Sequence, residues 1–308
     1  MITKQIIFSQ YSRERLLKFQ TETTLYEEKG KRYTKKRALN SEGVTHVKSM
    51  YENYILLNEQ CKNVKACKAI LQKNEIIFEY INGNTLENLL IKAIINNNER
   101  EFFRIIDQYV QLVRGLGTES INNFKSNKEF IEIFGIQFEQ EKVEVLEISN
   151  IDLIFSNIII DDNGEFYIID YEWVFNFKVP ILFVIYRSLY YFYLENNYYI
   201  EKLKLCFDEI LAYVKISKSD KILFDKMEQN FQNYVYGEKK KYGTPSAYFK
   251  KAKSVEDLEG SIEDLKQRLQ QKDEQIRQRD EQINNIYNLR GWKVLCGYYR
   301  FINKVKKK

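Results

Sequence analysis

Asn150-Ile-Asp-Leu-Ile-Phe-Ser-Asn157 and, shortly after it, Ile168-Ile-Asp-Tyr-Glu-Trp173 are the stretches that decide the fold of this chain. Within them, Asp152 precedes Asn157 by five residues, and Asn157 precedes Asp170 by thirteen. Asp170 directly follows an apolar run, and a carboxylate at the end of a buried strand costs free energy unless it binds something. The spacing therefore favours a metal site, although aspartate is also common in ordinary turns and at strand ends.

The segment between Asn157 and Asp170 consists of two β-type runs joined at Asn163-Gly164, the strongest short-range signal for a hairpin. A hairpin brings its two open ends together. We therefore expect an amide oxygen and a carboxylate to lie side by side, where they can share Mg²⁺ while Asp152 lies a loop's width away and orients a hydroxyl group.

The same spacing separates the catalytic-loop aspartate, the metal-binding asparagine and the second metal-binding aspartate of kinase-fold phosphotransferases. On this pattern Asp152 is the predicted catalytic residue, Asn157 and Asp170 are the predicted metal ligands, and ATP and Mg²⁺ are the predicted cofactors. The predicted fold class is α+β, a bilobal protein-kinase-like fold with a small β-rich N-lobe (residues 1–82) and a helical C-lobe (residues 83–250).

Length and composition agree with one catalytic domain and an appendage. The chain has 308 residues, of which 44% are hydrophobic, enough to bury a sizeable core. From Glu256 onward the composition turns to Glu, Gln, Asp, Arg and Lys with sparse aliphatics. Four scattered cysteines form no CxxC pattern, so neither a zinc site nor a disulfide framework is expected.

The first residues, Met1–Phe8, lack the hydrophobic region of a signal peptide, and the expected location is the reducing cytoplasm. The apolar, aromatic run 177–194 is interrupted by Lys178, Pro180 and Arg187 and is too short for a confident membrane span. We expect it to form a buried helix of the catalytic domain.

Two β-type runs, 18–27 and 31–39, flank Gly30 and predict a second hairpin. In a kinase fold, a lysine of the third strand reaches the α- and β-phosphates of ATP. Lys36 fits that place best, with Lys35 as the neighbouring candidate. The alternative is that this basic cluster is simply solvated.

A helical pattern of apolar residues runs from Val44 to about Asn58. Glu52 lies within it and could form the ion pair with the strand lysine that orders a kinase site, although a glutamate on a helix surface needs no such role. His46, the only histidine, is interpreted as structural rather than as a base, since it is far in sequence from the acids.

The run 76–81 predicts a buried strand that turns at Gly83 into a helix with Thr85 as its N-cap. In kinase-like enzymes this segment joins the lobes, so backbone groups of Glu79, Tyr80 and Ile81 are expected to meet adenine. No glycine-rich phosphate loop precedes Lys18, which weakens the case for a protein kinase more than the case for phosphoryl transfer.

The string from Asp152 to Tyr193, with the segments 36–46 and 78–83, resembles the kinase domain of the bifunctional methyltransferase/kinases that terminate lipopolysaccharide O-antigen chains. The resemblance covers roughly residues 1 to 250. It implies phosphorylation of the non-reducing end of a polysaccharide, a glycosyltransferase or polymerase partner, and tethering by a C-terminal coiled coil. It also implies that Asp152 is catalytic, that Asn157 and Asp170 bind Mg²⁺, and that Lys36 and Glu52 form the phosphate clamp.

Two features depart from that family. No glycine-rich strand-turn-helix fingerprint precedes the kinase-like segment, so the methyltransferase half is absent from this sequence and the acceptor is in doubt. The position two residues before the expected catalytic aspartate holds Asn150 rather than His.

Residues 256–289 carry aliphatic residues at steps of four and three, and Asp-Glu-Gln-Ile at 273–276 recurs one heptad later. This pattern predicts a coiled coil and a homo-oligomer, with Lys272 and Arg279 at seam positions. A single amphipathic helix packed on the domain is the alternative.

Residues 290–308 hold seven basic residues and no acid, and without them the formal net charge of +5 becomes −2. The basic balance therefore belongs to this tail, and nucleic-acid binding by the domain is not implied. Trp292, Leu295, Tyr299 and Ile302 share one helical face, as in helices that lie on anionic membranes. A helix that docks on a protein partner is the competing interpretation.

The sequence thus predicts a phosphotransferase that is peripheral on the inner face of the cell membrane and phosphorylates a glycan or polysaccharide terminus. Two rival hypotheses stay open. One is a catalytically silent scaffold of kinase fold in a glycan-assembly complex. The other is a small-molecule kinase of the aminoglycoside or choline type, which shares the chemistry but leaves the tail unexplained.

Overall fold

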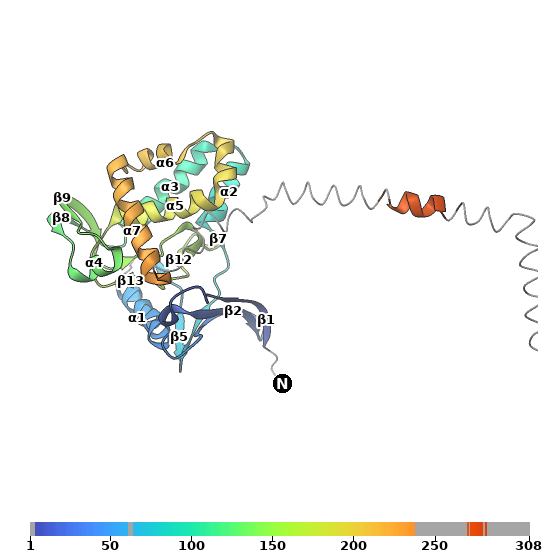
Figure 1. Ribbon diagram of the computed structural model, residues 1–308, viewed down its shortest axis with the longest axis horizontal. Coiled ribbons are helices and arrows are strands. Elements are labelled where there is room, and N and C mark those ends of the chain that lie inside the picture. Colours follow the sequence, from blue (N-terminus) through green and yellow to red (C-terminus); the bar gives the residue numbers. More distant parts are fainter. Residues whose placement is uncertain (1–3, 61–63, 238–269, 271, 280, 282–308) are drawn as a thin grey trace, which may run out of the picture. The chain divides into compact units, whose positions relative to one another are not determined.

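The computed structural model describes residues 4–60, 64–237, 270, 272–279 and 281. The chain divides into two units, Met1–Phe249 and Lys250–Lys308, and each is described by itself. Figure 1 shows the first unit with a β-rich N-terminal part (blue) and a helical part (green to orange). The predicted α+β class, with strands first and helices later, is confirmed.

The N-terminal part is an antiparallel sheet of five strands with one helix packed on it. The strand order is β1 (Gln5–Tyr11), β2 (Thr21–Glu28), β3 (Lys31–Ala38), β6 (Glu75–Glu79) and β5 (Ala69–Gln72). The predicted hairpin around Gly30 is therefore β2–β3. Helix α1 (Val44–Gln60) follows β3 and packs on β3, β5 and β6. This order of elements is the one expected for the N-lobe of a kinase-like fold.

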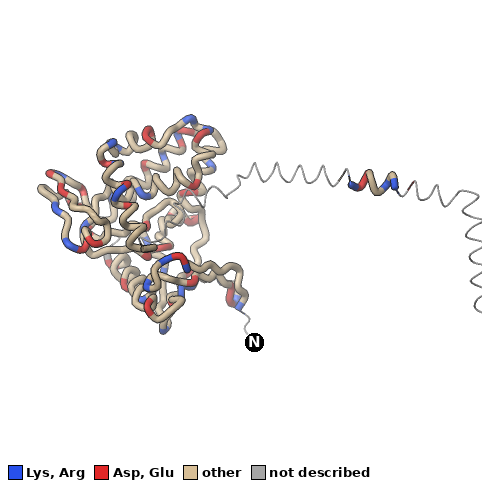
Figure 2. The backbone as a smooth tube through the Cα atoms, in the orientation of Figure 1, with Lys and Arg blue, Asp and Glu red and all other residues tan. Residues whose placement is uncertain are grey.

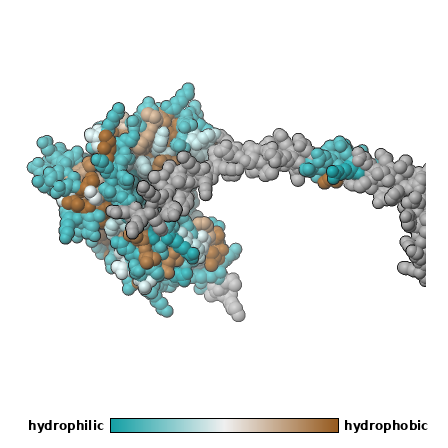
Figure 3. Space-filling view, viewed as in Figure 1, coloured by the Kyte–Doolittle hydropathy of each residue, from teal (hydrophilic) through white to brown (hydrophobic). Residues whose placement is uncertain are grey.

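Among the described residues, the main helices of the second part are α2 (Leu86–Ile95), α3 (Glu99–Arg114), α5 (Ile181–Ile200), α6 (Phe207–Tyr213) and α7 (Lys218–Tyr236). Thr85 is the N-cap of α2, as predicted, and its hydroxyl accepts a hydrogen bond from the Asn88 amide at 3.1 Å. Helix α5 lies at the centre and contacts α2, α3, α6 and α7. Its apolar residues, like those of α3, are largely buried, whereas hydrophobic residues on the visible face form separate patches between hydrophilic ones (Figure 3).

The apolar run 177–194 was expected to form a buried helix, and it does as α5. Pro180 precedes the first turn, where a proline is tolerated, and Arg187 is buried within the helix. Among the residues that the structure describes, no helix combines the length and the apolar character needed to cross a membrane.

Short strands connect the two parts. Strands β4 (Lys65–Ala66), β12 (Phe166–Ile168), β11 (Ile158–Ile160) and β7 (Asn84–Thr85) form one sheet, and β10 (Ser149–Asn150) pairs with β13 (Val174–Phe175). A further sheet was not anticipated from sequence. It contains β8 (Thr118–Lys125), β9 (Glu139–Leu146) and β14 (Val179–Pro180), with α4 (Lys128–Phe134) between β8 and β9. Figure 2 shows basic and acidic residues interspersed over the described residues of the first unit.

Gly83 marks a close approach of two backbones where the chain passes between the parts. Its φ is +155°, and a Cβ atom placed there would lie 2.2 Å from the carbonyl oxygen of Ile160. We expect Gly83→Ala to lower the free energy of unfolding by about 2 kcal/mol or more, because a backbone atom cannot move aside cheaply. Urea denaturation of the full chain measures this loss.

Gly164 provides the matched control, since its φ is +79° but nothing lies within 4 Å of the position of its Cβ. Gly164→Ala should cost only the left-handed backbone penalty, about 1 kcal/mol. Equal losses in both variants would show that the contact with Ile160 does not constrain Gly83.

In the second unit, the described residues 270, 272–279 and 281 are helical. They fall within the predicted coiled coil, 256–289, whose pairing stays a prediction. The predicted membrane-binding helix, 290–308, lies outside the described residues.

Candidate active site

The predicted hairpin between Asn157 and Asp170 is confirmed. Strands β11 and β12 pair antiparallel with Ile158 opposite Ile168, and the Ile169 amide donates to the Asn157 carbonyl at 3.0 Å. The turn is closed by Asp161, whose Oδ1 accepts from the amides of Asn163 and Glu165 at 2.9 and 2.8 Å. Asn157 and Asp170 therefore lie at the same open end of the hairpin.

Lys36 of β3 reaches this open end from the N-terminal sheet. Its Nζ lies 2.7 Å from Asp170 Oδ2 and 3.3 Å from Glu172 Oε2, and the side chain is buried. Lys35 points to the opposite face of the strand, since neighbouring side chains alternate, and its Nζ lies 3.3 Å from Glu75. Of the two candidate lysines, Lys36 is the one that faces the acids.

Glu172 is the centre of a charged cluster that was not predicted from sequence. Its Oε1 lies 2.5 Å from an Arg15 nitrogen and 2.6 Å from His46 Nε2, while Oε2 faces Lys36. Burial by itself would raise the pKa of Glu172, but Lys36 and Arg15 outweigh burial and hold this pKa well below its usual range. Glu172 is therefore ionised and orients the three basic groups around it. His46, although far from the acids in sequence, thus lies against one of them, and its structural role stays a prediction.

The expected ion pair between Lys36 and Glu52 is wrong. Helix α1 turns His46, Met50, Asn53 and Leu57 toward the rest of the domain, at steps of four, three and four, and all four are buried. Glu52 falls between these positions and is exposed to solvent, because successive helix residues are rotated by about 100°. The helix instead contributes Asn53, whose Nδ2 donates to the Tyr171 carbonyl at 2.9 Å.

Asp152 lies on the loop before the hairpin. One of its carboxylate oxygens accepts a hydrogen bond, and the other lies near an arginine. Oδ2 accepts from the Trp173 amide at 2.7 Å, and Oδ1 lies 4.0 Å from an Arg187 nitrogen. Burial, followed by the negative charge of Asp170, raises the pKa of Asp152 to about 7. A carboxylate with such a pKa can accept a proton near neutral pH.

The Asp152 loop is held from both sides. Asn157 Nδ2 donates to the Asp152 carbonyl at 3.0 Å, and Asn150 Oδ1 accepts from the Asp152 amide at 2.9 Å. Arg187 of α5 donates to the Ile151 carbonyl and to Glu228 Oε2, the latter at 2.6 Å. The sequence indicates that Arg187 has a partner, because it lies inside an apolar helical run. Burying a charge there costs free energy unless the charge is paired.

Of the predicted adenine-binding residues, Glu79 ends β6, and Tyr80 and Ile81 follow it in the connection to β7. The Glu79 amide donates to the Lys68 carbonyl at 2.9 Å, and its carbonyl accepts from Cys67 Sγ at 2.8 Å. The Cys67 carbonyl in turn accepts from the Tyr171 hydroxyl at 2.6 Å. These contacts link Glu79, where the chain passes from the first part to the second, to Tyr171, the residue after Asp170.

The donor groups of Asn157 and Asp170 fit Mg²⁺. Asn157 donates through Nδ2, which leaves its Oδ1 as an acceptor, and Asp170 Oδ1 has no hydrogen-bond partner among the described residues. In the part of the chain that the structure describes, no three His, Cys, Asp or Glu side chains gather into a metal site. Mg²⁺ in phosphotransferases needs only one or two protein oxygens, because phosphates and water complete its shell.

No protein-family model matches this sequence, and no curated protein is significantly similar to it. Among solved structures, choline kinase LicA from Streptococcus pneumoniae matches 77% of this chain and 89% of its own, with 15% identity and a TM-score of 0.36. Macrolide 2′-phosphotransferase type I matches 80% of this chain and 91% of its own, with 9% identity and a TM-score of 0.39. Neither is named as an O-antigen chain-terminating enzyme, so that resemblance stays a prediction.

Proposed function

We propose that this chain is an ATP- and Mg²⁺-dependent phosphotransferase that acts on a hydroxyl acceptor. The observation that carries the proposal is the meeting of Lys36 from β3 with Asp170 at the end of β12, beside Asp152 and Asn157. A lysine, an asparagine and two acids in these positions supply the parts that phosphoryl transfer requires, which are charge stabilisation and positioning.

In this proposal Asp152 holds the acceptor hydroxyl and receives its proton. The hydroxyl oxygen forms a bond to the γ-phosphorus of ATP, the bond from that phosphorus to the departing ADP oxygen breaks, and the hydroxyl proton passes to the Asp152 carboxylate. Lys36 neutralises phosphate charge, and Glu172 keeps Lys36 in place. Mg²⁺, held by Asn157 and Asp170, would supply further positive charge against the phosphates.

For the acceptor, we propose the terminal sugar of a cell-surface polysaccharide. The support is the resemblance of residues 36–46, 78–83 and 152–193 to the chain-terminating kinases, together with the heptads of 256–289 and the basic tail 290–308. These segments would hold an oligomer near a membrane where such a glycan is assembled.

The first test is binding of ATP in the presence of Mg²⁺, measured by calorimetry on the full chain. We expect Asp170→Ala to weaken binding by at least about 100-fold, because a metal ligand and the partner of Lys36 are both lost. Omitting Mg²⁺ should weaken binding in the wild type and change little in the variant.

Lys36→Met and Lys35→Met form a matched pair for the same measurement, since the two lysines are neighbours on one strand and face opposite sides. Only Lys36→Met should weaken ATP binding. If the wild type binds no ATP at millimolar concentration, the phosphotransferase proposal fails and the silent scaffold becomes the leading hypothesis.

A further inference from the structure

The connection between β1 and β2, residues 12–20, is bonded to the last turn of α7 (Figure 1). The Leu16 amide donates to the Val235 carbonyl at 2.9 Å. The Phe19 ring is buried, and its centroid lies 4.9 Å from that of the Trp173 ring. This connection therefore joins the N-terminal sheet directly to the helical part.

The β1–β2 connection stands where protein kinases carry the glycine-rich loop that covers the phosphates of ATP. It contains no glycine in this chain, and side-chain bonds fix its backbone. Gln20 Nε2 donates to the carbonyls of Arg13 and Arg15, at 2.8 Å in each case. At its two ends the Ser12 amide donates to the Thr21 carbonyl at 3.0 Å. From this fixed backbone, the side chain of Arg15 extends to the acids of the candidate site.

Arg15 places a second permanent cation at Glu172. One of its terminal nitrogens lies 2.5 Å from Glu172 Oε1, and its side chain is only 20% exposed. The Tyr236 hydroxyl, at the end of α7, lies beside the same guanidinium. Burial by itself would lower the pKa of Arg15, but the charge of Glu172 outweighs burial and raises this pKa, so Arg15 stays charged.

Lys36 depends on Arg15 because both basic groups share Glu172. The Lys36 ammonium faces two carboxylates, Asp170 at 2.7 Å and Glu172 at 3.3 Å. Among the described residues, Arg15 is the other lysine or arginine that contacts either acid. Since Arg15 lies closer to Glu172, it balances most of that charge. Without Arg15, two acids would face one ammonium, and Lys36 would be drawn toward Glu172 and away from a phosphate.

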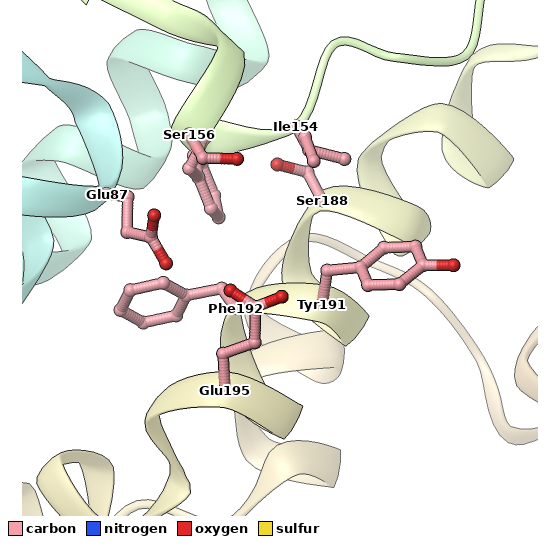
Figure 4. A pocket seen from close by; sticks show the side chains of 8 residues that line it. Glu87, Ile154, Ser156, Ser188, Tyr191, Phe192 and Glu195 are labelled. Atoms are coloured by element: carbon pink, nitrogen blue, oxygen red, sulfur yellow. The ribbon is translucent and has the colours of Figure 1, made fainter. Parts of the chain in front are cut away.

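The other side of the Asp152 loop carries negative charge. The loop forms one wall of a small recess, and Glu87 of α2 and Glu195 of α5 extend toward it (Figure 4). No lysine or arginine among the described residues lines this recess. Phosphate is an anion and is disfavoured there, so the positive charge that it needs comes from the side where Lys36 and Arg15 lie.

We infer that Arg15 is a positioning residue for phosphate binding and acts through Glu172 and Lys36. Arg15 holds Glu172 Oε1, and Glu172 Oε2 holds Lys36. The last step, in which Lys36 meets the phosphates, rests on the proposed phosphotransferase function. Because the β1–β2 connection is bonded to α7, the helical part helps to set the position of a lysine that belongs to the N-terminal sheet.

The first test compares Arg15→Met with Arg13→Met in the full chain. The two arginines lie in the same connection, but Arg13 is exposed and its guanidinium lies over the Tyr11 ring. Arg15→Met should weaken Mg²⁺-dependent ATP binding about tenfold, the lower end of the loss seen when a group that orients a ligand residue is removed. Adenosine binding should not change, because adenosine has no phosphate. Arg13→Met should bind both as the wild type does.

A purely structural role of Arg15 predicts a different result, which is weaker binding of ATP and adenosine by the same factor. That result, like unchanged ATP binding in Arg15→Met, would overturn the inference. Arg15→Lys restores the charge, and because one nitrogen makes the contact with Glu172, ATP binding should return to within about threefold of the wild type. A loss as large as in Arg15→Met would contradict the role of this charge. Arg15→Gln replaces Arg15→Met if the latter does not fold.

The NMR signal of the Lys36 side chain gives a readout without nucleotide. Lysine labelled with ¹³C at Cε is incorporated into the full chain, and the signal is identified by its loss in Lys36→Met. Arg15→Met should move this signal, whereas Arg13→Met should not, and an unmoved signal would overturn the inference. If the signal moves but the wild type binds no ATP, Arg15 still positions Lys36 and only the phosphotransferase proposal fails.

Discussion

Asp152→Asn is expected to reduce phosphoryl transfer by about 10²- to 10⁴-fold, the usual contribution of a positioned general base. The change removes the group that would accept the hydroxyl proton but keeps the shape of the side chain. The amide oxygen of asparagine can still accept from the Trp173 amide, and Arg187 keeps its bond to Glu228. The measurement is Mg²⁺-dependent release of ADP from ATP with water as the acceptor, since water needs the same base as an alcohol.

Asp162→Asn serves as the control, because Asp162 is exposed in the hairpin turn between β11 and β12. The Asp162→Asn variant should release ADP from ATP at the same rate as the wild type. ATP binding should be unchanged in both variants, which would separate loss of chemistry from loss of the site. Wild-type turnover in Asp152→Asn would remove Asp152 from the proposed mechanism.

Glu172→Gln is expected to destabilise the domain by about 3 kcal/mol. The substitution keeps the volume of the side chain, but it leaves Lys36 with Asp170 as its one acidic partner among the described residues and removes the carboxylate that faces Arg15. Removing one partner of a buried ion pair is costly because the remaining charge stays out of water. Urea denaturation at pH 7 measures the loss, and ATP binding should weaken as well because Lys36 loses a contact that holds it.

Glu75→Gln is the matched control on the same sheet. Glu75 pairs with Lys35 at 3.3 Å, but both side chains are partly open to solvent. Such a pair contributes about 1 kcal/mol or less, so the control should unfold close to the wild type. If Glu172→Gln is no more costly than Glu75→Gln, the cluster around Glu172 does not hold the site together.

Glu172 takes the place that Glu52 was expected to have. A glutamate on the helix after the third strand was predicted to hold the lysine, and in this chain the acid comes from two residues after Asp170. The helix contributes His46 and Asn53, which contact the side chain and the backbone of Glu172. The lysine is thus still held by a buried glutamate, but from a different element.

The sequence by itself determined the features that depend on neighbouring residues. Asn163-Gly164 predicts its hairpin because the turn requires a residue with positive φ, and Gly164 has a φ of +79°. Thr85 predicts the start of α2 because its hydroxyl can bond only to an amide a few residues away. The apolar run 177–194 predicts a buried helix because its hydrophobic surface must leave water.

Only the tertiary structure decided which charged side chains meet. Glu172 contacts Arg15, Lys36 and His46, all more than a hundred residues earlier in the chain. The face of α1 that packs on the sheet depends on a rotation of about 100° per residue, so a small uncertainty in register turns Glu52 inward or outward. Spacing along a sequence restricts local backbone geometry, whereas pairing of distant charges depends on packing between elements, which local patterns do not specify.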